Sequence, residues 1–312
     1  MEAAELLSSF ILHPSSFILH PSSFILHPSS FILSSFLPPV PLPFTKLATL
    51  PFFPRLGVFL LALAILWLPY VAIVYQWVDD ANTISLLVMP VLFLEFFGLV
   101  YVWGRRVYRI PQIFQSYGLE RSRPFVRDLL QGLGTGVTSL VSLFLVQTVL
   151  GWVGWQAPSE RLLLTVLEGL LVALGFGLAE ETIFRGWLLD ELQRDYSPAV
   201  ALWGSAIVFA GLHFIRPLDE ILKTFPQFAG LLLLGLTLVW AKRATGRLGW
   251  SVGLHGGLTW GYYMVNVGQL IRHTGQVPEW VTGIGNNPLA GAIGIGFMGS
   301  LALWMWGRSR IE

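Results

Sequence analysis

Residues 162–189 read LLLTVLEGLLVALGFGLAEETIFRGWLL. A helix needs about 20 apolar residues to cross a bilayer, and this stretch is longer than that. It nevertheless carries Glu180, Glu181 and Arg185 within apolar sequence. Ionisable groups inside a membrane span are costly and usually functional. The stretch therefore predicts a membrane helix that carries a candidate site.

The composition of the whole chain also indicates a membrane protein. The 312 residues are 54% hydrophobic and 12% charged, whereas a soluble domain has about 25% charged residues. Seven further apolar stretches cover residues 56–78, 84–103, 129–152, 199–215, 228–241, 248–267 and 289–306. A backbone in lipid must satisfy its own hydrogen bonds, and the alternation of barrel strands is missing. We predict an all-α polytopic membrane bundle of about eight transmembrane helices over residues 47–312.

The distribution of Lys and Arg predicts the orientation. Positive residues are enriched in cytoplasmic loops. With a cytoplasmic N-terminus, the inner set is Lys46, Arg55, Arg105, Arg106, Arg109, Arg121, Arg123, Arg127, Arg194, Lys242, Arg243, Arg247, Arg308 and Arg310. The outer set is Arg161, Arg216, Lys223 and Arg272. We therefore predict that both termini are cytoplasmic, in a multi-pass protein of a bacterial cytoplasmic membrane.

Charge and cysteine content exclude several classes of protein. The formal net charge is +1, so the chain has no basic face for nucleic acid. It has no cysteine, which excludes disulfides, thiolate nucleophiles and cysteine-ligated metals. The lipid bilayer is the partner that composition alone implies.

The N-terminal segment is a repeat. SSFILHP occurs at residues 8–14, 15–21 and 22–28, and the proline in each copy prevents a continuous helix. Copies this similar resemble a short DNA repeat read in frame. We expect residues 1–46, which include the proline-rich linker, to be a functionless extension or the result of a start codon placed too early. The alternative is a membrane anchor that lies on the bilayer surface. Only His213, His255 and His273 then remain for chemistry.

The two adjacent glutamates have different predicted roles. Glu181 and Arg185 are four residues apart, so they share a helix face and can pair. Glu180 is turned by about 100° and points elsewhere. Two adjacent carboxylates in an apolar helix cannot both ionise cheaply, so Glu180 is suited to act as a general acid or base. The alternative is an ion-pair network that only ties helices together.

Two histidines lie on other predicted spans. We expect His213 and His255 to meet Glu180 in the inner to middle part of the bilayer, in a cavity open to the cytoplasm. Glu95 and Glu168 are interpreted as polar packing residues, and His273 as a solvated loop residue. The glycine pairs Gly132/Gly136 and Gly253/Gly257 predict close helix packing.

One sequence pattern suggests a different chemistry. Residues 249–253, GWSVG, match the G-x-S-x-G pattern of serine hydrolases. Ser251 is four residues before His255, so a rhomboid-like serine protease is an alternative. The pattern normally requires a strand-to-helix elbow, and here it opens a membrane helix. No H-E-x-x-H zinc motif is present.

Three spaced motifs resemble the CPBP family, the CAAX prenyl protease and bacteriocin-processing endopeptidases. They are E-E-x-x-x-R at Glu180, Glu181 and Arg185, F-x-x-x-H at Phe209 and His213, and H-x-x-x-polar at His255 and Thr259. The resemblance covers about residues 129–267, which we take as the catalytic core. The family usually has asparagine where this chain has Thr259, and threonine is shorter.

The resemblance implies site residues and a reaction. Glu180, helped by His213, would activate a water molecule for attack on a peptide carbonyl. His255, with Thr259, would stabilise the oxyanion, and Arg185 would hold Glu181. Members are often classed as metalloproteases. We expect no obligatory cofactor, with Zn²⁺ held by Glu180, His213 and His255 as the alternative.

The predicted function is therefore that of an intramembrane endopeptidase. Its partner would be a peptide or protein substrate, either membrane-associated or cut at its C-terminal segment, near the cytoplasmic face. One alternative is a non-proteolytic scaffold or bacteriocin-immunity protein of the same fold. Another is a carrier that uses the buried glutamates and histidines as a proton relay, although the chain lacks obvious repeated halves.

Overall fold

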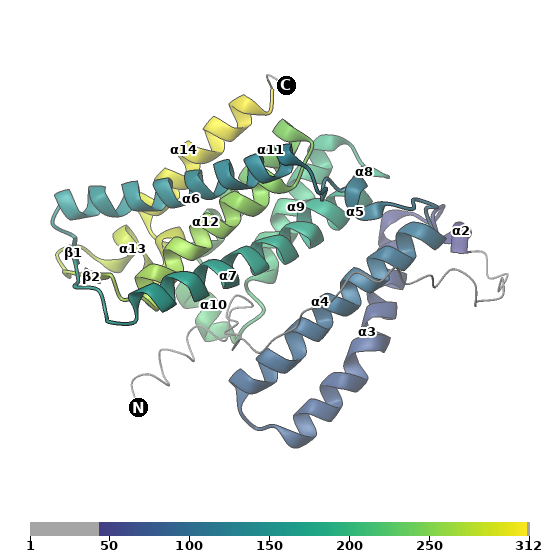
Figure 1. Ribbon diagram of the computed structural model, residues 1–312, viewed down its shortest axis with the longest axis horizontal. Helices are drawn as coiled ribbons and strands as arrows, with labels where there is room; N and C mark the ends of the chain where they lie inside the picture. Colours follow the sequence, from purple (N-terminus) through teal and green to yellow (C-terminus); the bar gives the residue numbers. More distant parts are fainter. Residues whose placement is uncertain (1–43, 311–312) are drawn as a thin grey trace.

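A computed structural model describes residues 44–310 of the chain (Figure 1). The SSFILHP repeat and most of the segment that we interpreted as an extension lie outside the described residues. The described part is helical apart from two three-residue strands. The predicted all-α class is confirmed.

Each predicted apolar stretch corresponds to one helix or continuous helical unit, with boundaries that differ by a few residues. These are α3 (Phe52–Trp77), α4 (Ala81–Arg106), α6 (Arg123–Val149), α7 (Leu162–Glu181) with η1 (Thr182–Leu188) and α8 (Leu189–Gln193), α9 (Pro198–Leu212), α11 (Gln227–Thr245), α12 (Gly249–Asn266) and α14 (Ala292–Arg308). Shorter elements are α2 (Phe44–Leu47), α5 (Ile113–Ser116), α10 (Leu218–Thr224), α13 (Glu279–Thr282), η2 (Ile284–Asn286) and η3 (Pro288–Ala290).

Five of the described helices are long and apolar enough to cross a membrane. They are α3, α4, α6, the α7–α8 unit and α11. Helix α9 is apolar but has only 15 residues. These are the marks of a multi-pass integral membrane protein. The count of eight crossings stays a prediction.

Side-chain caps and special residues fix where the helices begin and end. Ser122 and Ser197 accept hydrogen bonds from the backbone of α6 and α9, and each is followed closely by a proline in the first turn. Helix α11 ends at Gly246, whose φ of 68° lies in the left-handed region that glycine adopts without strain.

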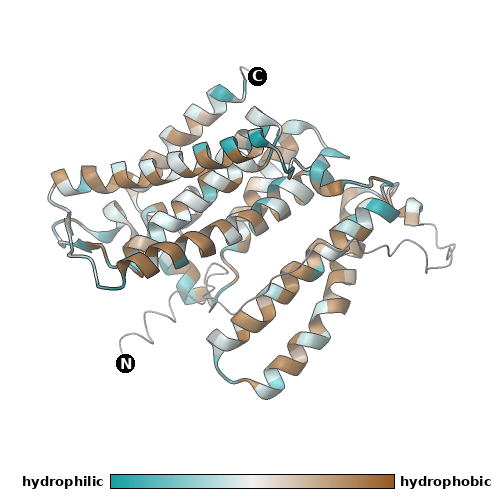
Figure 2. Cartoon of the chain, viewed as in Figure 1, coloured by the Kyte–Doolittle hydropathy of each residue, from teal (hydrophilic) through white to brown (hydrophobic). Residues whose placement is uncertain are grey.

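The α3–α4 hairpin projects from the rest of the bundle (Figure 1). Its surface is strongly hydrophobic (Figure 2), as expected for helices that face lipid. A buried ion pair fastens its base to the bundle, because Arg55 Nε donates to Glu191 at 2.7 Å. The Tyr108 hydroxyl also donates to Glu191. Burial, reinforced by Glu191, raises the pKa of Tyr108, so this donor stays protonated.

Helices α6, α12 and α7 pack closely at the centre of the bundle. A Cβ atom added to Gly253 would collide with the backbone oxygen of Leu129, and one at Gly136 would lie 2.7 Å from Leu254 O. Glycine is therefore required where α6 meets α12. The predicted close packing of both glycine pairs is confirmed.

The connecting segments gather at two ends of the bundle. Strand β1 (Val153–Trp155) pairs antiparallel with β2 (Ile271–His273), with Val153 opposite His273. Figure 1 places this sheet and α13 at the end opposite to α5 and α8. This grouping agrees with the predicted alternation of inner and outer loops, while the end that faces the cytoplasm stays a prediction.

One expectation about these segments is wrong. We expected His273 to be solvated, but its two ring nitrogens are enclosed and lack a hydrogen-bond partner among residues 44–310. Burial lowers the pKa of His273, which keeps the ring neutral. The reason is the β1–β2 pairing, which no pattern in the sequence indicates.

Candidate functional site

The first motif lies where α7 changes its winding. Glu180 and Glu181 end α7, and Arg185 lies in the seven-residue π-helix η1. Wide turns of this kind are rare and frequently occur at functional sites. Helix α11 holds the widened segment from outside: Lys242 Nζ donates to Arg185 O at 2.6 Å, and Arg185 donates to Gly235 O at 3.1 Å.

Glu181 connects the first motif to the third. Its Oε1 accepts from the Arg185 guanidinium at 2.9 Å and lies 2.9 Å from His255 Nδ1. Glu181 and Arg185 are fully buried. The predicted pairing of these two residues is confirmed. The bond to His255 was not predicted, and it makes Glu181 the group that orients the imidazole. A carboxylate partner requires a hydrogen on Nδ1 and directs Nε2 of the same ring to the other side.

Glu180 faces that other side of His255. Its Oε2 lies 3.8 Å from His255 Nε2 and has no hydrogen-bond partner within the described part of the chain. The two residues meet because α7 and α12 pack closely: a Cβ atom at Gly177 would lie 3.1 Å from Val252 O. The adjacent glutamates thus face different nitrogens of the same imidazole, and Glu181 alone of the two is hydrogen-bonded to Arg185.

His213 caps the C-terminal end of α9. Its Nδ1 lies 2.8 Å from the backbone oxygen of Phe209, which accepts a hydrogen bond from that nitrogen. The Phe209 ring packs against both imidazoles, with centroid distances of 4.7 Å to His213 and 6.0 Å to His255. The contacts explain why the second motif contains a phenylalanine: the Phe209 ring packs against both imidazoles and helps to fix their positions. The helix ends at Leu212, so His213 is not inside the helix that we expected over residues 199–215.

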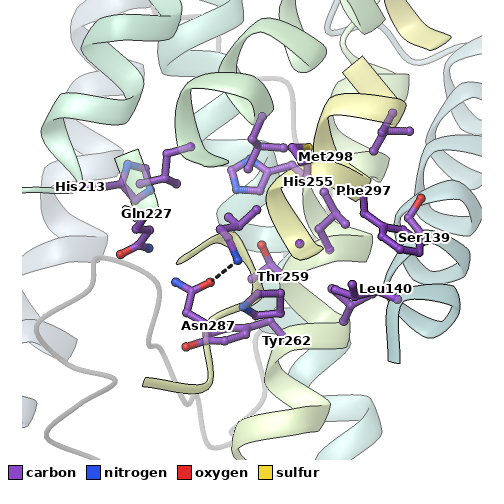
Figure 3. A pocket seen from close by; sticks show the side chains of 18 of the residues that line it. Ser139, Leu140, His213, Gln227, His255, Thr259, Tyr262, Asn287, Phe297 and Met298 are labelled. Atoms are coloured by element: carbon purple, nitrogen blue, oxygen red, sulfur yellow. Dashed lines mark hydrogen bonds between the residues drawn. The ribbon is translucent and has the colours of Figure 1, made fainter. Parts of the chain in front are cut away.

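The three motifs line one cavity of about 140 Å³ (Figure 3). Its walls include Glu180, His213, His255 and Thr259. Glu181 and Arg185 are not part of its walls and lie behind His255 and Glu180. The structure thus brings four of the six predicted site residues to one surface and places the other two in support.

Sequence reasoning missed several polar residues of this cavity. They are Ser139, Gln227, Tyr262 and Asn287, which Figure 3 shows around the same space. Ser139, Gln227 and Asn287 lie far from the motifs, and Tyr262 lies three residues after Thr259, but none of the four belongs to a motif pattern. The Asn287 side-chain oxygen accepts from Leu289 N at 3.0 Å, so the amide nitrogen is the end of this side chain that can donate a hydrogen bond.

The walls extend beyond the middle of the bundle. Gln227 begins α11, and Asn287 lies between η2 and η3. In the predicted topology these segments belong to the outer side. The residues that line the cavity therefore do not by themselves indicate the opening to the cytoplasm that we expected.

The other residues that the sequence singled out lie elsewhere. Ser251 is fully buried and its hydroxyl donates to Leu248 O at 3.0 Å, so it is not poised as a nucleophile next to His255. Glu95 and Glu168 do not line the cavity. Between residues 44 and 310, no three His, Cys, Asp or Glu side chains are grouped as a metal site would require. Glu180, His213 and His255 thus do not form an assembled zinc site here.

Together, these features define a helical membrane protein with an acid–imidazole site enclosed among its helices. Residues 162–261 match the model of a family described as Rce1-like, type II CAAX prenyl endopeptidase. This region is a domain of that family, as the motifs predicted. Membership implies a membrane endopeptidase. No curated protein and no solved structure matches the chain in comparable searches.

Proposed function

We propose that the protein is an intramembrane endopeptidase that hydrolyses a peptide bond of a membrane-associated or C-terminal substrate segment near the cytoplasmic face. The observation that carries the proposal is the shared cavity of Glu180, His213 and His255. These residues come from three different helical elements, and nothing but the fold brings them together. A structural ion pair would not need a cavity beside it.

The proposed step begins with a water molecule between Glu180 and the substrate. The Glu180 carboxylate takes a proton as the water oxygen bonds to the carbonyl carbon. The C=O bond becomes a single bond, and its oxygen carries the negative charge. The C=O bond then re-forms as the C–N bond breaks, and Glu180 gives the proton to the leaving nitrogen. The products are a free amine and a carboxylic acid, which loses its remaining proton to solvent.

His255 is proposed to bind the oxyanion. Glu181 holds its Nδ1, and Nε2 of the protonated ring donates to the developing charge. Because Glu181 is itself fixed by Arg185, the imidazole is oriented before substrate binds. His213, whose Nδ1 is occupied by the Phe209 carbonyl, presents Nε2 as an acceptor that orients the water.

Thr259 departs from the asparagine that the family usually has at this position. Its hydroxyl lines the cavity and can donate a hydrogen bond, although it reaches less far than an amide. Asn287 lines the same cavity, and its amide nitrogen can donate a hydrogen bond. We propose that Thr259 assists His255 and that the Asn287 amide lies near enough to hold the substrate backbone.

The proposal is tested with purified full-length protein in detergent and a quenched fluorescent reporter peptide. Glu180→Ala and His213→Ala should each abolish cleavage while the protein remains folded. Glu168→Gln is the matched control, because Glu168 lies on α7 but not on the cavity, and it should keep the wild-type rate. Full activity of both cavity variants would contradict the proposal and favour a scaffold.

Metal dependence needs its own measurement. The purified protein is analysed for bound metal and assayed after dialysis against a strong chelator. We expect activity to survive this treatment. Loss of activity that Zn²⁺ restores would show that Glu180, His213 and His255 rearrange around a metal ion.

A further inference from the structure

A second hollow lies on the surface of the bundle between α6 and α14. It has a volume of about 710 Å³ and is more open than the cavity. Its walls on α6 include Gln131, Thr135, Thr138, Ser139 and Ser142. Neighbours on α14 include Ser300, Trp304 and Arg308. We call this hollow the α6–α14 groove.

The polar lining of the groove is unusual for its place. Helix α6 is one of the five helices suited to cross a membrane. In a bilayer, polar side chains normally face the bundle interior or a water-filled space, because lipid tails offer no hydrogen bonds. Gln131 and Thr138 are exposed in the described chain. A hydrated groove is the arrangement that satisfies them.

The groove adjoins the cavity. Ser139, Phe297 and Leu301 line both. Figure 3 shows Ser139 and Phe297 on the side of the cavity away from His213. From these shared residues the groove extends to Arg308, near the C-terminal end of α14, which is cytoplasmic in the predicted topology. The groove thus runs from the wall of the cavity toward the side that is cytoplasmic in the predicted topology.

We propose that the α6–α14 groove is the lateral path by which the extended peptide segment of a membrane-attached substrate reaches the cavity. This inference rests on the proposed function and adds the route of the substrate. An extended backbone has unpaired N–H and C=O groups that must be satisfied inside a membrane. Hydroxyl groups can both donate to and accept from such a backbone. A lipid acyl chain has no donor or acceptor groups that could pair with these hydroxyls.

A charged group on the groove also fits a peptide. Trp250 contributes to the wall of the groove but is itself buried. Arg308 lies over the rings of Trp250 and Trp304, at 5.9 and 5.5 Å from their centroids. Its guanidinium provides a positive charge for an acidic group, such as a terminal carboxylate, at the cytoplasmic end.

The absence of cysteine makes the path directly testable. Ser300→Cys places a single thiol in the groove, and Leu303→Cys places one on the same helix but outside the groove, where Leu303 is 68% exposed. Each variant is labelled with a bulky maleimide and assayed on a reporter that carries a lipid anchor. Labelling at Ser300→Cys should lower kcat/KM at least about tenfold relative to the same unlabelled variant, and labelling at Leu303→Cys should change it less than about twofold.

A binding measurement separates this inference from the proposed function. Benzophenone maleimide is attached to the same two cysteines in a Glu180→Gln background, which holds the substrate without turnover. Irradiation should cross-link the anchored peptide from position 300 and not from position 303. Equal cross-linking at both positions, capture of phospholipid in place of peptide at position 300, or unchanged turnover after labelling there would each overturn the path. Absence of cleavage by the wild-type protein would instead contradict the endopeptidase.

Discussion

Substituting each of the two adjacent glutamates separately should distinguish an effect on the catalytic rate from an effect on the stability of the fold. Glu180→Gln keeps the shape of the side chain and removes the base. Glu181→Ala removes the carboxylate that Arg185 and His255 share. Both variants should be inactive, but for different reasons, because only Glu181 lies within a hydrogen-bonded ion pair.

The contacts set the size of each effect. Arg185 is fully buried, and Glu181→Ala would leave its guanidinium without a carboxylate. Breaking a buried pair from one side costs about 3–5 kcal/mol. That corresponds to a fall in Tm on the order of 10 °C. Glu180 Oε2 has no hydrogen-bond partner in the described structure, so Glu180→Gln should change the stability by less than about 1 kcal/mol. Loss of a general base should lower kcat roughly 10²–10⁴-fold.

The assay combines reporter cleavage with thermal unfolding in the same detergent. The chain has 13 tryptophans, so intrinsic fluorescence follows unfolding without a label. The expected loss of cleavage rate for Glu180→Gln is at least about a hundredfold. A Glu180→Gln protein whose cleavage rate is within threefold of the wild-type rate would therefore refute the assignment of Glu180 as the base. A Glu181→Ala protein with the wild-type Tm would refute the role of the buried pair.

Three further changes have defined outcomes. Thr259→Asn should preserve or raise kcat, because the longer amide can also donate to the oxyanion, and a steep fall would mean that the third motif is misplaced. Gly253→Ala should destabilise the protein by about 1–3 kcal/mol and lower its Tm, because a Cβ atom at this position would collide with the backbone of α6. Gly175→Ala is the control: a Cβ atom there has open space around it, so the Tm should not change. Arg55→Met should destabilise the protein by about 3–5 kcal/mol by leaving the buried Glu191 carboxylate without its cation, and adding Glu191→Gln should recover part of that loss in a double-mutant cycle.

The sequence predicted the long helices and the Glu181–Arg185 pair, for a physical reason. Long apolar stretches can exist in lipid only as helices, so the positions of α3, α4 and α6 follow from composition alone. A charged group within such a stretch needs a compensating partner, and Glu181 with Arg185 at a spacing of four supplies one. The glycines at Gly136 and Gly253 indicated where helices touch.

The rest depended on contacts between distant segments. The bond from Glu181 to His255 joins residues 74 positions apart, and no local pattern specifies it. Asn287 comes from a segment without regular periodicity, and its place on the cavity depends on how η2 and η3 fold back on the bundle. The π-helix over Thr182–Leu188 was also missed, because one extra residue in a turn leaves no mark in hydropathy.

The most direct test of the central claim is cleavage of the reporter peptide in water enriched in ¹⁸O. If Glu180 activates water in the cavity, the wild-type protein should place one ¹⁸O atom in the newly formed carboxylate, and Glu180→Gln should form the product at least about a hundredfold more slowly. Cleavage by Glu180→Gln at the wild-type rate, or no cleavage by a folded wild-type protein, would contradict the account.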